Sequence, residues 1–302
     1  MSFALLFSGQ GAQHPAMLPW LAEDETVRAV QRAVGAGWRE SLADRAWAGR
    51  NANAQPLLTG LALAAWAQIA VLLDQRAVAL AGYSVGELAA CAAAGACDGP
   101  TAVSMAQRRA AFMDEGAELQ PTALLGISGL SGDAMERLCA DFNLDIAIRN
   151  GIDSVVVGGL RTALPAAMEA AQRQGARCTE LNVQIASHTR WMAGAARAFA
   201  DWIAPLPLQA PRTVLFTNAA GRVTTVPTLK AALARQIDHT VRWDECMEGI
   251  AARQPACVLE IGPGQALARM WNERYPQIPA RSADEFRSAR AIAEWVLRQS
   301  PS

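Results

Sequence analysis

The segment Gly82-Tyr83-Ser84-Val85-Gly86 has the pattern Gly-x-Ser-x-Gly, which can present a nucleophilic serine. A short apolar run over 78–81 precedes it, and a helical pattern over about 85–94 follows it. The glycines permit a sharp strand-to-helix turn, which would expose the serine oxygen and direct the next backbone N–H at a developing oxyanion. A glycine-flanked helix cap would have the same local sequence, but the strand and helix around the motif favour the nucleophile.

A serine nucleophile needs a base, and the chain contains three histidines, His14, His188 and His239. His188 is the best candidate. The order of elements, described below, predicts a small domain inserted into a larger one, with a cleft between them. His188 follows the last strand of that small domain, where the chain would return to the larger domain beside the cleft. A polar residue at a helix start would look the same. His239, in Asp238-His239-Thr240, is the rival base.

The loop Gly9-Gln10-Gly11 follows a buried-strand candidate near the N-terminus. It is not a dinucleotide fingerprint, since His14 stands where Gly-x-Gly-x-x-Gly needs its third glycine. The glycines would instead let backbone amides approach a substrate closely, as the second donor of an oxyanion hole must. A simple turn is the alternative.

Strands alternating with helices predict a parallel sheet covered on both faces. We expect these strands at 3–7, 78–81, 214–217 and 257–261, and helices at 56–75, 85–94, 100–120, 243–253 and after Pro263. The middle of the chain reads β-α-β-β-α-β, the ferredoxin-like order, with strands at 124–127, 144–150, 154–158 and 178–183 and helices at 131–141 and 161–174. We therefore predict an α/β domain of residues 1–121 and 187–302, interrupted by a small domain over 122–186. The cleft between the two domains would hold the substrate.

The composition is that of an ordinary enzyme, with 302 residues, 52% of them hydrophobic. The 27 basic and 28 acidic residues leave a formal charge of −1, so no general attraction to nucleic acid or to a membrane is expected. The six cysteines are scattered without a CxxC pair, which favours buried thiols in a reducing compartment over a metal site. The N-terminus lacks the features of a signal peptide, and the longest apolar stretch, 57–73, is too interrupted to span a bilayer. We therefore expect a cytoplasmic location.

Five blocks of the sequence, in this order and spacing, resemble the malonyl-CoA:acyl carrier protein transacylase family. They are Ser8-Gly9-Gln10-Gly11-Ala12-Gln13, Gly82-Tyr83-Ser84-Val85-Gly86-Glu87, Gln107-Arg108-Arg109-Ala110-Ala111-Phe112-Met113, Ser187-His188 and Glu260-Ile261-Gly262-Pro263-Gly264. The resemblance spans nearly the whole chain. It implies an α/β-hydrolase-like domain with an inserted ferredoxin-like domain, in agreement with the expected order of elements.

The resemblance also implies the roles of particular residues. It makes Ser84 the nucleophile and His188 the base, with the backbone N–H groups of Gln10 and Val85 as the oxyanion hole.

Arg109 matches the arginine that binds the free carboxylate of a malonyl group, a role suited to a guanidinium fork. Without the resemblance, Arg109 would be read as a solvated helix charge. The backbone carbonyl of Gln236 matches the group that orients the histidine.

The implied reaction takes malonyl from malonyl-CoA to the phosphopantetheine-type thiol of an acyl carrier protein, with no metal and no permanently bound cofactor. Two departures from the family pattern stand out. Tyr83 stands where the family usually has histidine. A tyrosine at this position most resembles the epsilon subunit of malonate decarboxylase, which transfers malonyl to that enzyme's own carrier subunit. Asp238-His239-Thr240 replaces Tyr-Asn-Pro, so the role of His239 stays open.

Three alternatives remain at this point. The carrier could belong to fatty-acid or polyketide synthesis, water could replace the carrier thiol in a thioesterase, or the chain could be a non-catalytic module that docks acyl carriers.

Overall fold

The computed structural model of the chain describes residues 2–118, 120–181, 183 and 185–299, whose strands form two sheets. The larger sheet has the order β11-β10-β1-β2-β7-β8, with β1 at Phe3–Phe7, β2 at Ala79–Gly82, β7 at Leu215–Thr217, β8 at Gly221–Val223, β10 at Cys257–Ile261 and β11 at Ala280–Ser282. The smaller sheet has the order β6-β3-β5-β4-β9, with β3 at Thr122–Ser128, β4 at Asp145–Arg149, β5 at Ser154–Leu160, β6 at Arg177–Glu180 and β9 at Val241–Arg242.

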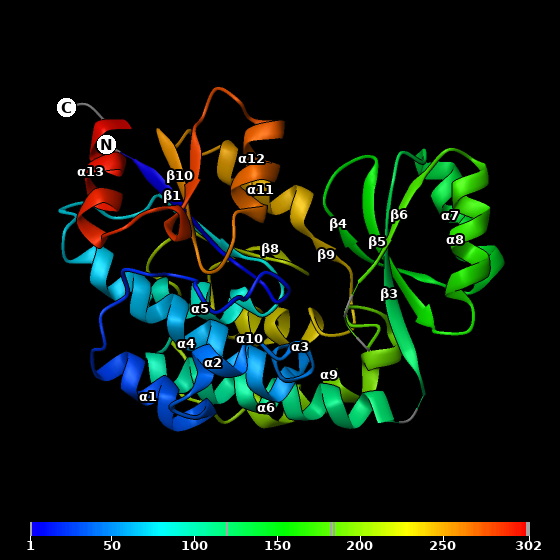
Figure 1. The fold of residues 1–302 in the computed structure, drawn as a ribbon, viewed down its shortest axis with the longest axis horizontal. Helices are drawn as coiled ribbons and strands as arrows, with labels where there is room; N and C mark the ends of the chain where they lie inside the picture. The colour runs from blue at the N-terminus through cyan, green and yellow to red at the C-terminus, as the bar shows by residue number, and fades with distance from the viewer. Residues whose placement is uncertain (1, 119, 182, 184, 300–302) are drawn as a thin grey trace.

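The α-helices of the described residues surround these sheets (Figure 1). They are α1 Glu25–Val34, α2 Trp38–Ser41, α3 Arg45–Gly49, α4 Asn51–Ala70, α5 Gly86–Ala93, α6 Gly99–Glu118, α7 Gly132–Phe142, α8 Leu164–Arg173, α9 Ala193–Ile203, α10 Val226–Arg235, α11 Trp243–Ala251, α12 Ala266–Arg274 and α13 Ala289–Gln299. Within the described ranges, no helix is long and apolar enough to cross a membrane.

The larger sheet is mainly parallel, as the sequence predicts. β1 pairs in parallel with β10 and with β2, β2 with β7, and β10 with β11, whereas β8 returns antiparallel to β7. The carboxyl ends of β1, β2, β7 and β10 therefore lie along one edge of the sheet, where loops from distant parts of the sequence come together.

Alternate residues of β1 pack into different cores, which shows that helices cover both faces of the larger sheet. Phe3, Leu5 and Phe7 lie in a core built largely from α4, α5, α6 and α9. Ala4 and Leu6 lie in a second core with residues of α11 and α12. Figure 1 shows these two helix layers below and above the strands.

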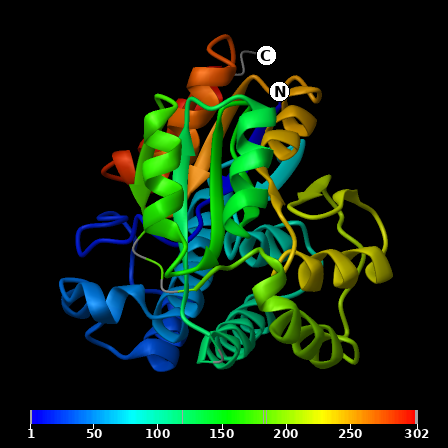
Figure 2. The ribbon, with the colours of Figure 1, turned by 90° about the vertical axis from the view of Figure 1, so that its right-hand side faces the viewer.

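The smaller sheet follows the expected order β3-α7-β4-β5-α8-β6, and its strands pair antiparallel. One face packs against α7 and α8, which stand in front of the sheet in Figure 2. The short strand β9, which the sequence did not predict, adds to β4 in parallel and continues directly into α11. The two sheets are therefore tied together through the chain segment 241–251.

Most predicted elements are confirmed, with shifted ends. The helix expected at 56–75 is wrong at both ends. Helix α4 begins earlier, at Asn51, so that Pro56 lies inside it, and it ends earlier, at Ala70, before Val71, which is 82% exposed. The strand expected over 178–183 ends at Glu180. Three residues of the predicted elements lie outside the described residues. Residue 119 falls in the helix expected at 100–120, residue 182 in the strand expected at 178–183, and residue 184 in the expected small domain. Helices α1, α2, α3, α9, α10 and α13 and strands β8 and β11 were not predicted.

Trp243, at the start of α11, should be a main stabilising residue because it is fully buried in the core that contains residues of both sheets. We expect Trp243→Ala to lower the free energy of unfolding by about 3–5 kcal/mol through lost burial and a residual cavity. Urea unfolding measures this change. Trp202→Ala, at a half-buried site on α9, is the control and should cost clearly less; equal costs would contradict a special role for Trp243.

Candidate active site

Ser84 lies at a sharp turn between the carboxyl end of β2 and the start of α5. Its φ is +52°, a left-handed conformation that a residue with a side chain adopts at a cost on the order of 1–3 kcal/mol. The flanking glycines leave no room for a side chain: a Cβ on Gly82 would lie 2.1 Å from the backbone of Gly86, and a Cβ on Gly86 would lie 2.3 Å from the carbonyl oxygen of Phe7. Both glycines of the Gly-x-Ser-x-Gly pattern are therefore required by close backbone packing, of Gly82 against Gly86 and of Gly86 against the end of β1.

Asn218, which directly follows β7, holds this turn in place. Its side-chain oxygen accepts the backbone N–H of Ser84 at 2.8 Å, and its side-chain nitrogen donates to the carbonyl of Gly82 at 2.7 Å. Its own N–H donates to a carboxyl oxygen of the buried Glu87 at 2.8 Å. The sequence analysis missed Asn218, whose one available signal was its position at the end of a predicted strand next to the nucleophile strand.

His188 is the histidine that the structure brings to Ser84. Its Nε2 lies 2.8 Å from Ser84 Oγ, and its Nδ1 lies within hydrogen-bond distance of the backbone carbonyl of Gln236. An Nδ1–H that donates to this carbonyl leaves the Nε2 lone pair directed at the serine hydroxyl. His239 instead pairs with Asp238 at 2.6 Å, with its side chain 48% exposed.

His188 is held in its neutral form. It is 2% exposed. Burial lowers the pKa of His188 to about 3, with a further lowering from the positive charge of Arg109, against a smaller opposing effect of the hydrogen bond to Gln236. The imidazole can therefore accept a proton at neutral pH.

Arg109, on α6, is 1% exposed and lies beside the serine. It donates to Gln55 Oε1 at 2.8 Å and, through Nη2, to Gln236 Oε1 at 2.9 Å and Ser84 Oγ at 3.3 Å. Burial lowers the pKa of Arg109 to about 10, so the guanidinium stays charged at neutral pH. Among the described residues no carboxylate lies within ion-pair distance of it. A buried cation with amide partners suits an incoming carboxylate.

Gln236 has two contacts in the site beyond its backbone carbonyl. Its side-chain oxygen accepts from Arg109, and its side-chain nitrogen donates to the carbonyl of Ser84 at 3.2 Å. The sequence analysis identified only the carbonyl and missed Gln55, a fully buried polar residue of α4. A glutamine just before a long apolar stretch was the available signal.

Gln10 and Val85, the residues expected to supply the oxyanion donors, lie on two segments that pack against each other. Val85 is buried at the N-cap position, directly before α5. The loop that carries Gln10 packs against the nucleophile turn, since a Cβ on Gly9 would lie 2.7 Å from the carbonyl oxygen of Tyr83. The side chain of Gln10 donates to the carbonyl of Gly49 at 3.1 Å, which fixes the loop from its other side.

The block at 260–264 supports the same loop. Ser8 Oγ donates to a carboxyl oxygen of Glu260 at 2.8 Å, and the N–H of Ala268 donates to the other carboxyl oxygen at 2.8 Å. Gly262 lies so close to Ser8 that a Cβ would be 2.7 Å from its side chain. The first and last blocks of the sequence pattern thus form one packed unit beside Ser84.

Tyr83 connects the nucleophile turn with the smaller sheet. Its hydroxyl donates to Asn150 Oδ1 at 3.0 Å, in the turn between β4 and β5. Its ring meets Trp243 edge-on, with ring centroids 5.2 Å apart. The residue that departs from the family pattern therefore fixes one sheet against the other.

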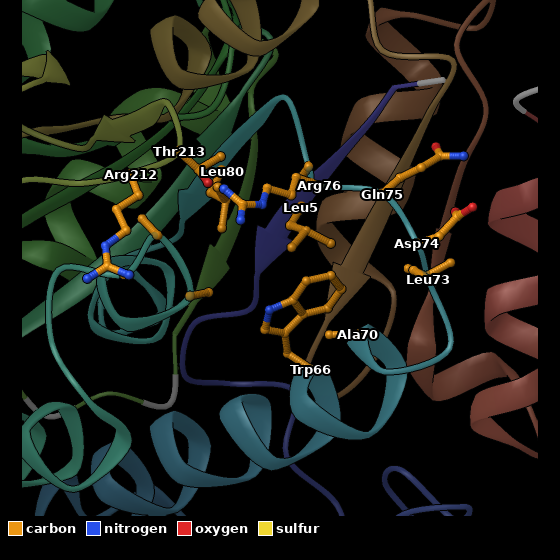
Figure 3. A pocket seen from close by; sticks show the side chains of 14 residues that line it. Leu5, Trp66, Ala70, Leu73, Asp74, Gln75, Arg76, Leu80, Arg212 and Thr213 are labelled. Atoms are coloured by element: carbon orange, nitrogen blue, oxygen red, sulfur yellow. The ribbon is translucent and has the colours of Figure 1, made fainter.

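A cavity of about 430 Å³ elsewhere in the molecule is distinct from this site (Figure 3). Leu5, Leu80 and Trp66 line it, with Arg76 and Arg212 near the amino ends of β2 and β7. Ser84 lies at the opposite, carboxyl end of β2. Within the described part of the chain, no group of three or more His, Cys, Asp or Glu side chains is placed to hold a metal ion.

Comparison with known proteins places this geometry in a family. Residues 4–296 match the family model described as the acyl transferase domain. The malonyl CoA-acyl carrier protein transacylase of Mycobacterium tuberculosis is 32% identical over 295 residues, covering 92% of this chain and 95% of that protein. The acyl-carrier-protein S-malonyltransferase of Burkholderia pseudomallei superposes with a TM-score of 0.89 at 27% identity, covering 97% of this chain and all (100%) of that one.

A malonyl-transacylase solved in complex with its type II polyketide acyl carrier protein also superposes, with a TM-score of 0.86 at 25% identity and coverage of 97% and 99%. The similarity to these enzymes thus extends over nearly the whole length of the chain. The chain is an enzyme of the acyl transferase family.

Proposed function

We propose that this enzyme moves a malonyl group from malonyl-CoA, through an ester on Ser84, to the thiol of an acyl carrier protein. The observation that carries the proposal is the position of Ser84 Oγ, 2.8 Å from the neutral imidazole of His188 and 3.3 Å from the buried guanidinium of Arg109. A base for the nucleophile and a cation for an acidic acyl group thus meet at one oxygen. The names of the relatives agree with this reaction.

In the first half-reaction, Ser84 Oγ attacks the thioester carbonyl carbon while His188 Nε2 takes the hydroxyl proton. The carbonyl of Gln236 stabilises the resulting imidazolium through its bond with Nδ1–H. The backbone N–H groups of Gln10 and Val85 stabilise the oxyanion. The C–S bond then breaks, the CoA sulfur takes the proton from His188, and a malonyl-serine ester remains.

In the second half-reaction the carrier thiol gives its proton to His188 and attacks the ester carbonyl. The C–O bond to Ser84 breaks, and the serine oxygen recovers the proton. No step requires an acidic third member of a triad, since a carbonyl orients the histidine.

Arg109 selects the acyl group in this proposal. A malonyl carboxylate would supply the counter-charge that the guanidinium otherwise lacks, whereas an acetyl group would leave the cation buried without one. The site should therefore prefer malonyl to acetyl donors.

We further infer that the acceptor is the carrier subunit of malonate decarboxylase, with its dephospho-CoA-derived arm. Tyr83 supports this choice over a carrier of fatty-acid or polyketide synthesis.

The domain division stays a proposal as well. Residues 122–186 would form a ferredoxin-like subdomain, and residues 1–121 with 187–302 an α/β-hydrolase-like domain. The strand order β6-β3-β5-β4 supports the first assignment. The cytoplasmic location, the lack of a permanent cofactor and the lack of nucleic-acid or membrane partners stay predictions.

Brief exposure to malonyl-CoA should add one malonyl group to the wild-type protein, as measured by intact-protein mass. Ser84→Ala should gain none, because the attacking oxygen is gone. Arg109→Ala should lose the preference for malonyl-CoA over acetyl-CoA, because the carboxylate loses its partner.

The fate of the adduct separates the alternatives. Discharge on addition of the decarboxylase carrier subunit, but not of a fatty-acid carrier, is the expected result, and the reverse would contradict the acceptor assignment. Rapid loss as free malonate without any carrier would indicate a thioesterase. A wild type that gains no adduct would overturn the covalent mechanism and favour a docking module.

The acylation rate should be independent of pH from about 8 down to about 5, because the lowered pKa of His188 keeps it neutral until the pH approaches about 3. In Arg109→Gln the repulsion is removed, so the pKa of His188 should rise and the rate should fall at a higher pH. Both proteins should be compared with acetyl-CoA as the acyl donor, because an acetyl group has no carboxylate for Arg109 to bind. Glu87→Gln is the control: burial raises the pKa of Glu87 to about 8, so this group is already uncharged in the acidic range. An unchanged midpoint in Arg109→Gln would contradict the electrostatic coupling.

Asn218→Ala should slow acylation by roughly 10- to 100-fold, because the Ser84 turn loses both hydrogen bonds that hold it. Single-turnover kinetics with malonyl-CoA measure this rate. Thr217→Val is the matched control, since it removes one buried hydrogen bond, to the carbonyl of Gly221, away from the turn. If both variants lose similar stability but only Asn218→Ala loses acylation rate, Asn218 positions the nucleophile turn. Equal acylation rates in the two variants would exclude that role.

A further inference from the structure

The cavity at the amino ends of β2 and β7, drawn in Figure 3, has a volume of about 430 Å³. Its deepest lining residues are Leu5 of β1 and Leu80 of β2, which are fully buried. Trp66 and Ala70 of α4 and Ala93 of α5 line it nearer the surface. A cavity of this volume with an apolar lining is typical of a site for a small apolar ligand.

The apolar surface continues past the mouth of this cavity. Ala70 and Leu73 both line it, and between them in the chain stand Val71 and Leu72, which are 82% and 43% exposed. Few large apolar side chains of the described residues are exposed to this degree. Exposed apolar side chains that adjoin an apolar cavity favour a binding site over an incidental hollow.

Arg76 brings a positive charge to the cavity. It lies between α4 and β2 and is exposed, and within the described part of the chain its guanidinium has no hydrogen-bond or ion-pair partner. Figure 3 shows its side chain extending across the cavity, toward the segment that carries Arg212 and Thr213. Its donors are therefore available to an anion that enters the cavity.

Arg212, which precedes β7, is a second cation of the lining. Its backbone N–H donates to the carbonyl of Ala94 at 2.8 Å, and a Cβ on Gly95 would lie 3.2 Å from its Cδ, so its stem is held at the end of α5. Its guanidinium donates to Gln209 at 3.0 Å and does not point toward Arg76 in Figure 3. Arg212 is exposed, so its side chain can rotate to meet a ligand that Arg76 already holds.

Asp74 is the acidic residue of the lining, and it is exposed. Two guanidinium groups against one carboxylate leave the cavity with an excess of positive charge. A cationic ligand would therefore be repelled, whereas a small inorganic anion would leave the apolar lining uncovered. The combination selects a ligand with one negative end and an apolar body that needs no hydrogen bonds.

We propose that this cavity binds a free aliphatic carboxylate of medium chain length. The chain lies against Leu5, Leu80 and Trp66, and the carboxylate accepts hydrogen bonds first from Arg76 and then from Arg212. A guanidinium fork suits a carboxylate because it donates two parallel hydrogen bonds to its oxygens. The cavity lies at the amino end of β2 and Ser84 at the carboxyl end, so this inference does not depend on the proposed function.

Isothermal titration calorimetry with decanoate, kept below its micelle concentration, tests the ligand class. Decanoate should bind the wild-type protein with a stoichiometry of one. Butyrate, which keeps the carboxylate and shortens the chain, should bind at least tenfold more weakly, because each buried methylene contributes roughly fourfold in affinity. Decylamine, which keeps the chain and reverses the charge, should also bind at least tenfold more weakly.

Variants of the lining locate the site. Arg76→Ala should weaken decanoate binding roughly tenfold and Arg212→Ala roughly threefold, since Arg76 is the first partner of the carboxylate. Arg76→Lys, which retains the charge, should recover part of the affinity. Ala70→Phe, which places a ring in the cavity and keeps both arginines, should reduce binding at least tenfold.

Each substitution has a matched control. Arg222→Ala removes an exposed arginine of β8, and Ala67→Phe adds a ring at an exposed position of α4; neither residue lines the cavity. Both controls should bind decanoate as the wild type does. An unchanged thermal unfolding midpoint shows that a variant is folded, and if Ala70→Phe fails this criterion the arginine variants decide.

A wild type without saturable decanoate binding would overturn the inference. Binding that is equally tight for decylamine, or that neither arginine variant weakens, would overturn the assignment of the carboxylate to these residues. Decanoate binding that stays unchanged in a folded Ala70→Phe variant would place the ligand elsewhere and overturn the site.

Discussion

The site depends on one constraint, the tight backbone packing of the nucleophile turn, in which Gly82 lies against Gly86 and Gly86 lies against the end of β1. Within this tight turn Ser84 has a left-handed conformation, at the carboxyl edge of the sheet. Because that conformation is unfavourable, the surrounding structure must hold it, and Asn218 does so from the next strand in the sheet. The parallel pairing of β1, β2 and β7 is what brings these carboxyl ends together.

Burial then decides which groups carry charge. The pKa of His188 is lowered and that of Glu87 is raised, so both side chains are uncharged at neutral pH, while Arg109 keeps its proton despite its own lowered pKa. The same low-polarity surroundings therefore give a neutral base and a buried cation side by side. This division of roles suits nucleophilic attack on a thioester that carries an acidic acyl group.

The smaller sheet contributes to the site through its connections. The chain returns from β6 through Ile185 to His188, and the turn between β4 and β5 receives the Tyr83 hydroxyl. His188 in turn lies 2.8 Å from the oxygen of Ser84, which the larger sheet carries. The relative position of the two sheets thus affects both the base and the nucleophile turn.

The sequence by itself determined the nucleophile turn and the bounds of β1 and β10, because fully buried runs and paired glycines are local signals. It favoured His188 over His239 as the base, but only the contact of His188 with Ser84 decided between them. It did not reveal Asn218 or Gln55, nor the short strand β9. Asn218 meets Ser84 across 134 positions of sequence, and Gln55 meets Arg109 across 54. Only the tertiary structure decided these contacts, since a polar residue's partner depends on which strands and helices become neighbours, and local periodicity carries no information about that.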